Sequence, residues 1–321
     1  MLNYFILIAL GLVGLFFGGN WLVKGAARFA TALGVSPLVI GLTIVAFGTS
    51  VPELLVSIDS ALKGVSDIAL GNVVGSNIAN IGLILGVTAM IYPVAIEWSL
   101  LRREIPLMIV ASFALMVMVF DGQISQFDGF ILFAGFIGFN VYALVMARRD
   151  KRQIMQELAQ YEKEEGITNG GGINKLYELL RLAAGIVLLI FGAQWTVEGA
   201  VGVAQVFGVS SFIIGVTVVA FGTSLPELTA SVIGALRKEN DIVMGNVIGS
   251  NVANILAILG ITAMITPIGV AERIYQFDMV FMIGFALALM PFLLRNIMKR
   301  WMGALFFVVY CLFITLTVTT T

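Results

Sequence analysis

The chain alternates long apolar runs with short breaks that are charged or rich in turn-forming residues. A membrane hydrocarbon core of about 30 Å needs about 20 predominantly apolar residues per spanning helix. Runs of this length recur along the whole chain and predict an all-α integral membrane protein. The ten predicted transmembrane helices are residues 3–23, 38–60, 68–92, 104–120, 128–147, 182–200, 209–234, 242–266, 277–294 and 301–318.

Lysine and arginine are unevenly distributed among the breaks between these spans. If the N-terminus lies outside, ten spans place 16 of the 18 Lys and Arg residues on the inner side and only Lys63 and Arg273 outside. Cytoplasmic loops of membrane proteins carry such an excess of basic residues. The pattern predicts a multi-pass protein of the plasma (inner) membrane, with both termini outside and the polar segment 148–181 in the cytoplasm.

Two long stretches of sequence occur twice at a constant separation. GVSPLVIGLTIVAFGTSVPELLVS starts at Gly34 and returns as GVSSFIIGVTVVAFGTSLPELTAS from Gly208, and GNVVGSNIANI from Gly71 returns as GNVIGSNVANI from Gly245. Over residues 34–93, 37 of 60 positions are identical at an offset of 174 residues, without a gap. This agreement indicates an internal duplication.

Each copy lies in a half with five predicted spans, so the second half enters the membrane from the opposite side. Inverted-topology repeats are typical of secondary transporters, whose substrate sites lie near the bilayer midplane where the repeats meet. The predicted organisation is a five-helix repeat over 1–147, a cytoplasmic linker over 148–181 and an inverted five-helix repeat over 182–321. A duplicated scaffold without a site is the alternative, which the shared polar positions disfavour.

Composition narrows the chemistry that such a site can use. The chain is 60% hydrophobic and 12% charged with a net charge of −1, and its scattered basic residues do not predict a nucleic-acid-binding face. It has no histidine, and its one cysteine, Cys311, lies in the last apolar run. Zinc, copper and nickel sites normally need imidazole or thiolate ligands. A metal ion bound here would therefore be held by oxygen, and no resident cofactor is predicted.

Two glutamates, Glu53 and Glu227, lie inside otherwise apolar spans at the same position of each repeat. A carboxylate at this depth is costly unless it faces a cavity or a cation, which makes it a candidate functional residue. Each follows a Gly-Thr-Ser-x-Pro sequence, and proline disrupts the preceding helical turn. We expect the helices to break just before the glutamates, near the midplane, and to free the carbonyls of residues 46–49 and 220–223 as cation ligands.

The next span of each half contributes smaller polar side chains. Asn72, Ser76 and Asn80 are spaced four residues apart and share one helix face, as do Asn246, Ser250 and Asn254 in the second half. Calcium takes six to eight oxygen ligands, which two glutamates, backbone carbonyls and water can supply. Neutral oxygens beside a dicarboxylate suit Na⁺. Interhelical hydrogen bonding is the other interpretation of these asparagines and serines, and close helix packing is the favoured one for the glycines of the same motif.

The paired GTS-x-PE and GN-x-x-GSN-x-x-N motifs resemble the α-repeats of the Ca²⁺/cation antiporter superfamily, specifically the prokaryotic Na⁺/Ca²⁺ exchangers. The resemblance covers essentially all ten spans. It implies that Glu53 and Glu227 are shared Ca²⁺ and Na⁺ ligands. The resemblance also implies that further ligands come from Thr49, Thr223, Ser50, Ser224, Ser76, Ser250 and the carbonyls of Ala46 and Ala220. It implies that Asn80 and Asn254 line the centre of the site. Relatives that use K⁺ carry an aspartate at one of the positions of Asn80 and Asn254, so the two asparagines argue against K⁺ co-transport.

These observations predict a secondary antiporter that exchanges Ca²⁺ for Na⁺, electrogenically at three Na⁺ per Ca²⁺, and that functions as a monomer in the lipid bilayer. An H⁺/Ca²⁺ antiporter using the same glutamates is the alternative, which the sequence does not separate. A passive channel and an intramembrane hydrolase are less favoured, since neither explains the inverted repeat and its flanking ligands. The protein is not predicted to be an enzyme.

Overall fold

The structure is a computed structural model that describes all residues except 98–99, 101, 150–172, 209–219, 294–295 and 321. Helices account for most of the described residues, as the apolar pattern predicts. The first half consists of α1 (Leu2–Leu33), α2 (Pro37–Ile40), η1 (Gly41–Val45), α3 (Ala46–Thr49), α4 (Val51–Leu62), α5 (Ser66–Ala79), η2 (Asn80–Leu85), α6 (Gly86–Ile91), β1 (Val94–Ala95), α8 (Glu104–Met118), η3 (Val119–Asp121), β2 (Gln123–Ile124) and α9 (Gln126–Arg149).

The second half repeats this order. It consists of α11 (Lys175–Val206), α13 (Ala220–Thr223), α14 (Leu225–Leu236), α15 (Asn240–Ala253), η5 (Asn254–Ile258), α16 (Leu259–Ile265), β3 (Ile268–Gly269), η6 (Ile274–Asp278), α17 (Met279–Leu293), β4 (Ile297–Met298) and α18 (Arg300–Thr320). Each of η1, η2, η5 and η6 is a widened π-helical turn within a longer helix, and η3 is a short 3₁₀ helix.

The described residues contain eight helices that are long and apolar enough to cross a membrane. The pair Pro37–Thr49 and Val51–Leu62 forms a ninth candidate, bent by 43°. The remaining predicted span, residues 209–234, lies partly outside the described residues, which include its second part as α14. Every other predicted span corresponds to a helix.

Two helices differ in length from the prediction. α1 and α11 have 32 residues each, against predicted spans of 3–23 and 182–200. At about 1.5 Å per residue each is about 48 Å long, which exceeds the hydrocarbon thickness and fits a strongly tilted helix. Residues 175–181, which the prediction assigned to the linker, form the first turns of α11. Asn174 caps this helix by accepting hydrogen bonds from the backbone amides of Leu176 and Tyr177.

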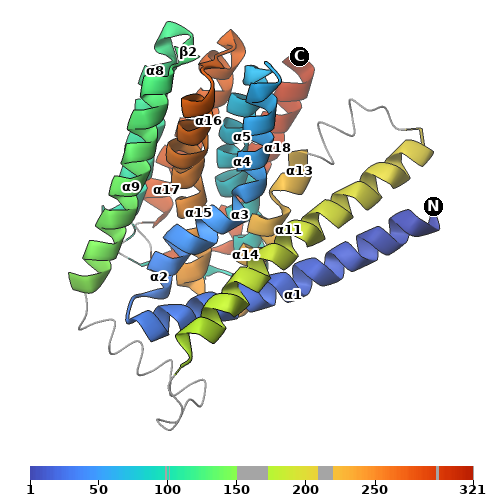
Figure 1. Cartoon of the computed structure of the whole chain (residues 1–321), viewed down its shortest axis with the longest axis vertical. Coiled ribbons are helices and arrows are strands. Elements are labelled where there is room, and N and C mark those ends of the chain that lie inside the picture. The colour runs from blue at the N-terminus through green and yellow to red at the C-terminus, as the bar shows by residue number, and fades with distance from the viewer. Residues whose placement is uncertain (98–99, 101, 150–172, 209–219, 294–295, 321) are drawn as a thin grey trace.

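α1 and α11 lie side by side and run obliquely across the other, more upright helices (Figure 1). Glycines allow this close approach. A Cβ atom built on Gly185 of α11 would lie 2.4 Å from the backbone nitrogen of Leu22 on α1. A side chain at this position would force the two helices apart.

Two short antiparallel sheets join the halves. β1 pairs with β4, so that Val94 faces Met298, and β2 pairs with β3, so that Ile124 faces Ile268. β1 and β2 correspond to β3 and β4 at the same offset of 174 residues. Each strand thus pairs with a strand from the other half, and the two sheets are related by a pseudo-twofold exchange of the repeats.

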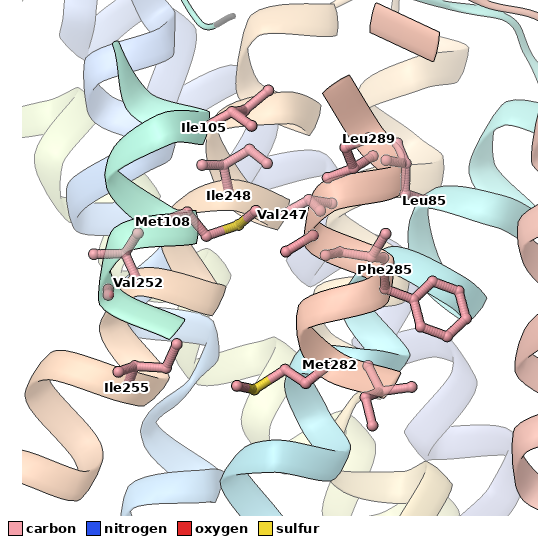
Figure 2. Packing of buried hydrophobic residues seen from close by; sticks show 14 of the residues in the cluster. Leu85, Ile105, Met108, Val247, Ile248, Val252, Ile255, Met282, Phe285 and Leu289 are labelled. Atoms are coloured by element: carbon pink, nitrogen blue, oxygen red, sulfur yellow. The ribbon is translucent and has the colours of Figure 1, made fainter. Parts of the chain in front are cut away.

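The main core lies where helices of both halves meet. Figure 2 shows Ile105 and Met108 of α8 facing Ile248 and Val247 of α15, with side chains of α17 across from them. These residues belong to one buried apolar cluster that draws on both repeats. α5 and α15, which carry the two asparagine motifs, belong to the two most deeply buried of the candidate spans in the described residues.

Candidate cation site

The helices that carry the two glutamates break where the sequence predicts. α3 ends at Thr49 and α4 begins at Val51, and the connecting Ser50 has φ −84° and ψ 8°. Ser224 has nearly the same conformation between α13 and α14, with φ −87° and ψ 2°. Pro52 and Pro226 occupy the first turn after each break. Because proline has no N–H, the carbonyl four residues earlier loses its helical donor.

Glu53 and Glu227 are each the third residue of the helix after the break. Both are buried, with 1% and 2% of their surface exposed. The exposed amides and the dipole at a helix N-terminus favour a negative charge there. The local break therefore offsets part of the cost of burying each carboxylate.

The two repeats meet at these glutamates. The Ser50 hydroxyl, from the first repeat, donates to Oε1 of Glu227 in the second repeat, at 3.2 Å. In the opposite sense, the Thr223 side chain hydrogen-bonds Glu53, and the two carboxylates are close enough for their charges to repel each other. The centre of the molecule thus holds up to two negative charges from symmetry-related positions.

Asn72 and Asn246 fix the helices that carry the glutamates. The Asn72 amide donates to the backbone carbonyl of Glu53 at 3.1 Å and to the Ser57 hydroxyl at 3.0 Å. In the second half, Asn246 makes the same two contacts with the Glu227 carbonyl and Ser231, at 3.4 and 3.2 Å. These contacts hold the backbone beside each glutamate, and they are the interhelical hydrogen bonds that the sequence left open as one interpretation of the asparagines.

Asn246 also reaches across to the first repeat. Its Oδ1 lies 3.1 Å from the Thr49 hydroxyl, which in turn lies 3.2 Å from the Ala46 carbonyl oxygen. The Ser250 hydroxyl approaches the same carbonyl at 3.4 Å. The Ala46 carbonyl was expected to be freed by the helix break, but it still accepts the backbone N–H of Ser50 at 3.2 Å. The helical turn of α3 continues to the Ser50 amide, so this carbonyl keeps its helical partner.

Three oxygen atoms at the centre have no hydrogen-bond partner among the described residues. They are Oε2 of Glu53, Oε2 of Glu227 and Oδ1 of Asn254, all fully buried. The Asn254 amide donates to Oδ1 of Asn77 at 3.0 Å, which leaves the Asn254 oxygen available. A buried polar atom without a partner is destabilising unless something binds it. Two carboxylate oxygens and one amide oxygen are ligands that a hard cation such as Ca²⁺ or Na⁺ prefers.

The remaining predicted residues lie on the same elements. Ser76 and Asn80 are buried on α5 and η2, at 7% and 2% exposure, and Ser224 is buried at 4%. Ala220 begins α13. Asn80 and Asn254 each start a π-helical turn, a distortion that is frequent at functional sites.

One contact in the centre was missed from the sequence. Asn77 is 1% exposed, and its amide lies 3.3 Å from the Asn251 carbonyl oxygen while its own oxygen accepts from Asn254. It belongs to the repeated GSN motif, which could have indicated its importance. The four-residue spacing of the predicted ligands excluded it, because Asn77 lies one residue beyond Ser76. The actual contact crosses between repeats, and no spacing within one helix reveals it.

The described residues contain no group of three or more Asp, Glu, His or Cys side chains placed to hold a metal ion. The arrangement is a pair of carboxylates with neutral oxygens around it. Such a centre can bind one divalent cation or a small number of monovalent cations reversibly.

Two similar halves of membrane-spanning helices, meeting at a pair of buried glutamates, define the class as a two-repeat membrane protein. The chain matches the sodium/calcium exchanger protein family over residues 3–145 and again over 177–319, and it belongs to that family.

Individual relatives agree with this assignment. The chain is 34% identical to the sodium/calcium exchanger MaX1 of Methanosarcina acetivorans, with 97% of each protein covered. It is 39% identical to the putative antiporter CaxA of Alkalimonas amylolytica, over 83% of this chain and 82% of that one. The structure resembles that of the sodium–calcium exchanger NCX_Mj soaked with Na⁺ and Ca²⁺, with a TM-score of 0.83, 32% identity and 97% of each chain covered.

Proposed function

We propose that this protein exchanges Ca²⁺ for Na⁺ across the membrane at the site formed by Glu53 and Glu227. The observation that carries the proposal is the pair of buried carboxylate oxygens without a hydrogen-bond partner, contributed by equivalent positions of two repeats. Membership of the sodium/calcium exchanger family supports the choice of ions. One Ca²⁺ or two Na⁺ neutralise the two glutamates, so the ions compete for the same charge.

The proposed ligand set is the one that the resemblance to the exchanger family implies. The proposed Ca²⁺ ligands are the carboxylates of Glu53 and Glu227 with Thr49 and Thr223 beside them. The flanking Na⁺ sites use Ser50, Ser224, Ser76 and Ser250 with the carbonyls of Ala46 and Ala220. Asn80 and Asn254 line the centre. The approach of the Ser250 and Thr49 hydroxyls to the Ala46 carbonyl supports one such flanking group.

The proposed topology is ten membrane spans in two inverted five-helix repeats, with residues 150–172 within a cytoplasmic linker and both termini outside. The two sheets support this arrangement. β1 and β4 tie two predicted inner loops together, and β2 and β3 tie two predicted outer loops together. The complete pair of repeats lies in one chain, so we propose that a monomer in the plasma membrane is the transport unit.

The proposed cycle moves three Na⁺ against one Ca²⁺ and carries one net charge. A tenfold Na⁺ gradient is worth about 1.4 kcal/mol per ion. One charge crossing about 100 mV adds about 2.3 kcal/mol. Together they give about 6.5 kcal/mol, which sustains a Ca²⁺ gradient of about 10⁴–10⁵. Two Na⁺ without charge movement would sustain only about a hundredfold gradient.

The counter-ion is tested by loading vesicles that contain the purified protein with Na⁺, with an acidic buffer, or with neither. Uptake of ⁴⁵Ca²⁺ is then followed after dilution into neutral medium free of Na⁺. Na⁺-loaded vesicles are expected to accumulate Ca²⁺ and the other two are not. Accumulation driven by the pH gradient alone would assign the site to protons instead.

A further inference from the structure

Each repeat forms a lipid-facing groove between its last two helices. One groove lies between α17 and α18 and has a volume of about 370 Å³. The other lies between α8 and α9, reaches α15 and η5, and has a volume of about 630 Å³. All eight residues that line the smaller groove correspond, at the offset of 174 residues, to residues lining the larger one. The two grooves are therefore repeats of one structural feature.

The larger groove differs at one end in its charge. Arg102 and Arg103 line it where α8 begins, whereas the equivalent positions of the second repeat are Gln276 and Phe277. The rest of its lining is apolar apart from Tyr142. The groove thus combines two guanidinium groups at one end with a long apolar channel.

The larger groove is also longer, and one glycine accounts for part of this. Gly138 lines it, and a Cβ atom built there would meet nothing within 4 Å. The equivalent residue of the second repeat is Leu312, whose larger side chain occupies the matching place on α18. From Pro106 to Met118, the lining of α8 extends about 18 Å at about 1.5 Å per residue. One leaflet of the hydrocarbon core is about 15 Å thick, so the channel has the length of one leaflet.

The groove opens on the membrane rather than on the protein core. Val110 on α8 is 62% exposed and Ile131 on α9 is 42% exposed, while Val252 at its floor is buried. The opposite face of α8 carries Ile105 and Met108, which pack on α15 (Figure 2). An occupant must therefore enter from the bilayer.

We propose that this groove binds an anionic phospholipid of the cytoplasmic leaflet. Arg102 and Arg103 would contact the phosphate and headgroup, because guanidinium groups bind phosphate oxygens with paired N–H donors. An acyl chain would fill the channel past Gly138 and pack against Val252 and Leu256. These two residues flank Asn254, so the lipid would contact the segment that carries a proposed ion ligand. The choice of leaflet rests on the orientation given under Proposed function.

The test measures lipid binding to the purified, full-length protein by native mass spectrometry, with phosphatidylglycerol and phosphatidylcholine as probes. The Arg102→Gln/Arg103→Gln variant is expected to lose about 25-fold in affinity for phosphatidylglycerol and little for phosphatidylcholine. A basic residue near an anionic membrane surface contributes about 1 kcal/mol, or about fivefold per arginine. The charge-matched control is Lys24→Gln/Lys299→Gln, which removes two inner basic residues that do not line the groove.

A second pair of variants tests the channel. Gly138→Leu introduces the residue that the second repeat carries, and it is expected to weaken binding of both lipids at least about fivefold. Gly284 lines the smaller groove and corresponds to Val110 of the larger one. The control Gly284→Val therefore introduces the residue of the first repeat, and it is expected to change the binding of neither lipid. Melting temperatures check that all variants fold.

The proposal is overturned if the arginine variant loses no more phosphatidylglycerol affinity than the lysine control, or if Gly138→Leu binds lipid as well as Gly284→Val. Exchange measured in pure phosphatidylcholine vesicles reports on the ion site separately. A failure of lipid binding with exchange intact would therefore leave the proposed function standing.

Discussion

Glu53 and Glu227 carry the proposed chemistry at the scale of single residues. Removing one partner of a buried ionic contact costs about 3–5 kcal/mol, which corresponds to at least about a hundredfold loss of affinity. We expect Glu53→Gln and Glu227→Gln each to reduce Na⁺-driven ⁴⁵Ca²⁺ uptake by at least this factor. Glutamine keeps the shape of the side chain and removes half of the charge of the site.

The matched control is Asp59→Asn on the same helix, α4. Asp59 is exposed and pairs with Lys63, and such surface ion pairs contribute about 0–1 kcal/mol. This variant should exchange at the wild-type rate. Near-normal uptake by either glutamine variant would mean that the two glutamates do not form one shared site.

The sequence was sufficient to single out the glutamates, because a carboxylate within an apolar run is conspicuous. It was not sufficient for Asn77, whose importance comes from its contact with Asn254 in the other repeat. It also left Asn72 and Asn246 open between small ligands and interhelical hydrogen bonding, and in the structure their amides hold the backbone beside the glutamates. Residue type and spacing identify a polar helix face, but the contacts across the repeats depend on packing.

At the scale of elements, the break at Ser50 and Ser224 follows from the proline two residues later and was predictable. The extra length of α1 and α11 was not, since their oblique course depends on the close contact between the two helices. The packing of α15 against η1 and α3 was expected from its glycines. A Cβ atom on Gly249 would lie 2.5 Å from the Leu42 carbonyl oxygen and 2.7 Å from the Ala46 Cβ.

We therefore expect Gly249→Ala to push α15 away from α3 and to separate Ser250 from the Ala46 carbonyl. Overpacking typically costs about 1–3 kcal/mol, so the melting temperature should fall along with the Na⁺ affinity of exchange. Gly284→Ala is the control, because a Cβ atom there meets nothing within 4 Å. If both alanine variants behave alike, the close contact at Gly249 does not support the site.

At the scale of the whole molecule, the proposed inverted repeat requires the linker and the C-terminus to lie on opposite sides of the membrane. In Figure 1 the end of α9 and the C-terminus lie at opposite ends of the upright helices. After Cys311→Ala, single cysteines at Gln160 and Thr319 should react with a membrane-impermeant thiol reagent from opposite sides, with Gln160 cytoplasmic. Labelling of both from one side would contradict the ten-span topology.

Charge balance gives a second prediction for the whole molecule. In the proposed site, Asn80 and Asn254 take the place of a third carboxylate that could neutralise a third Na⁺, so each cycle should move one positive charge in the direction of Na⁺ movement. Clamping the membrane potential with K⁺ and valinomycin should then speed or slow ⁴⁵Ca²⁺ flux according to its sign. A flux that follows the Na⁺ gradient and ignores the potential would indicate two Na⁺ per Ca²⁺.

The most direct test of the account follows both ions in the same vesicles. Vesicles loaded with ²²Na⁺ are diluted into medium that contains ⁴⁵Ca²⁺, and the initial rates of Na⁺ efflux and Ca²⁺ uptake are compared. The account predicts that Ca²⁺ entry is matched by the efflux of three Na⁺ per Ca²⁺, and that both fluxes are lost in Glu53→Gln and Glu227→Gln. Ca²⁺ entry without accompanying Na⁺ efflux would contradict it.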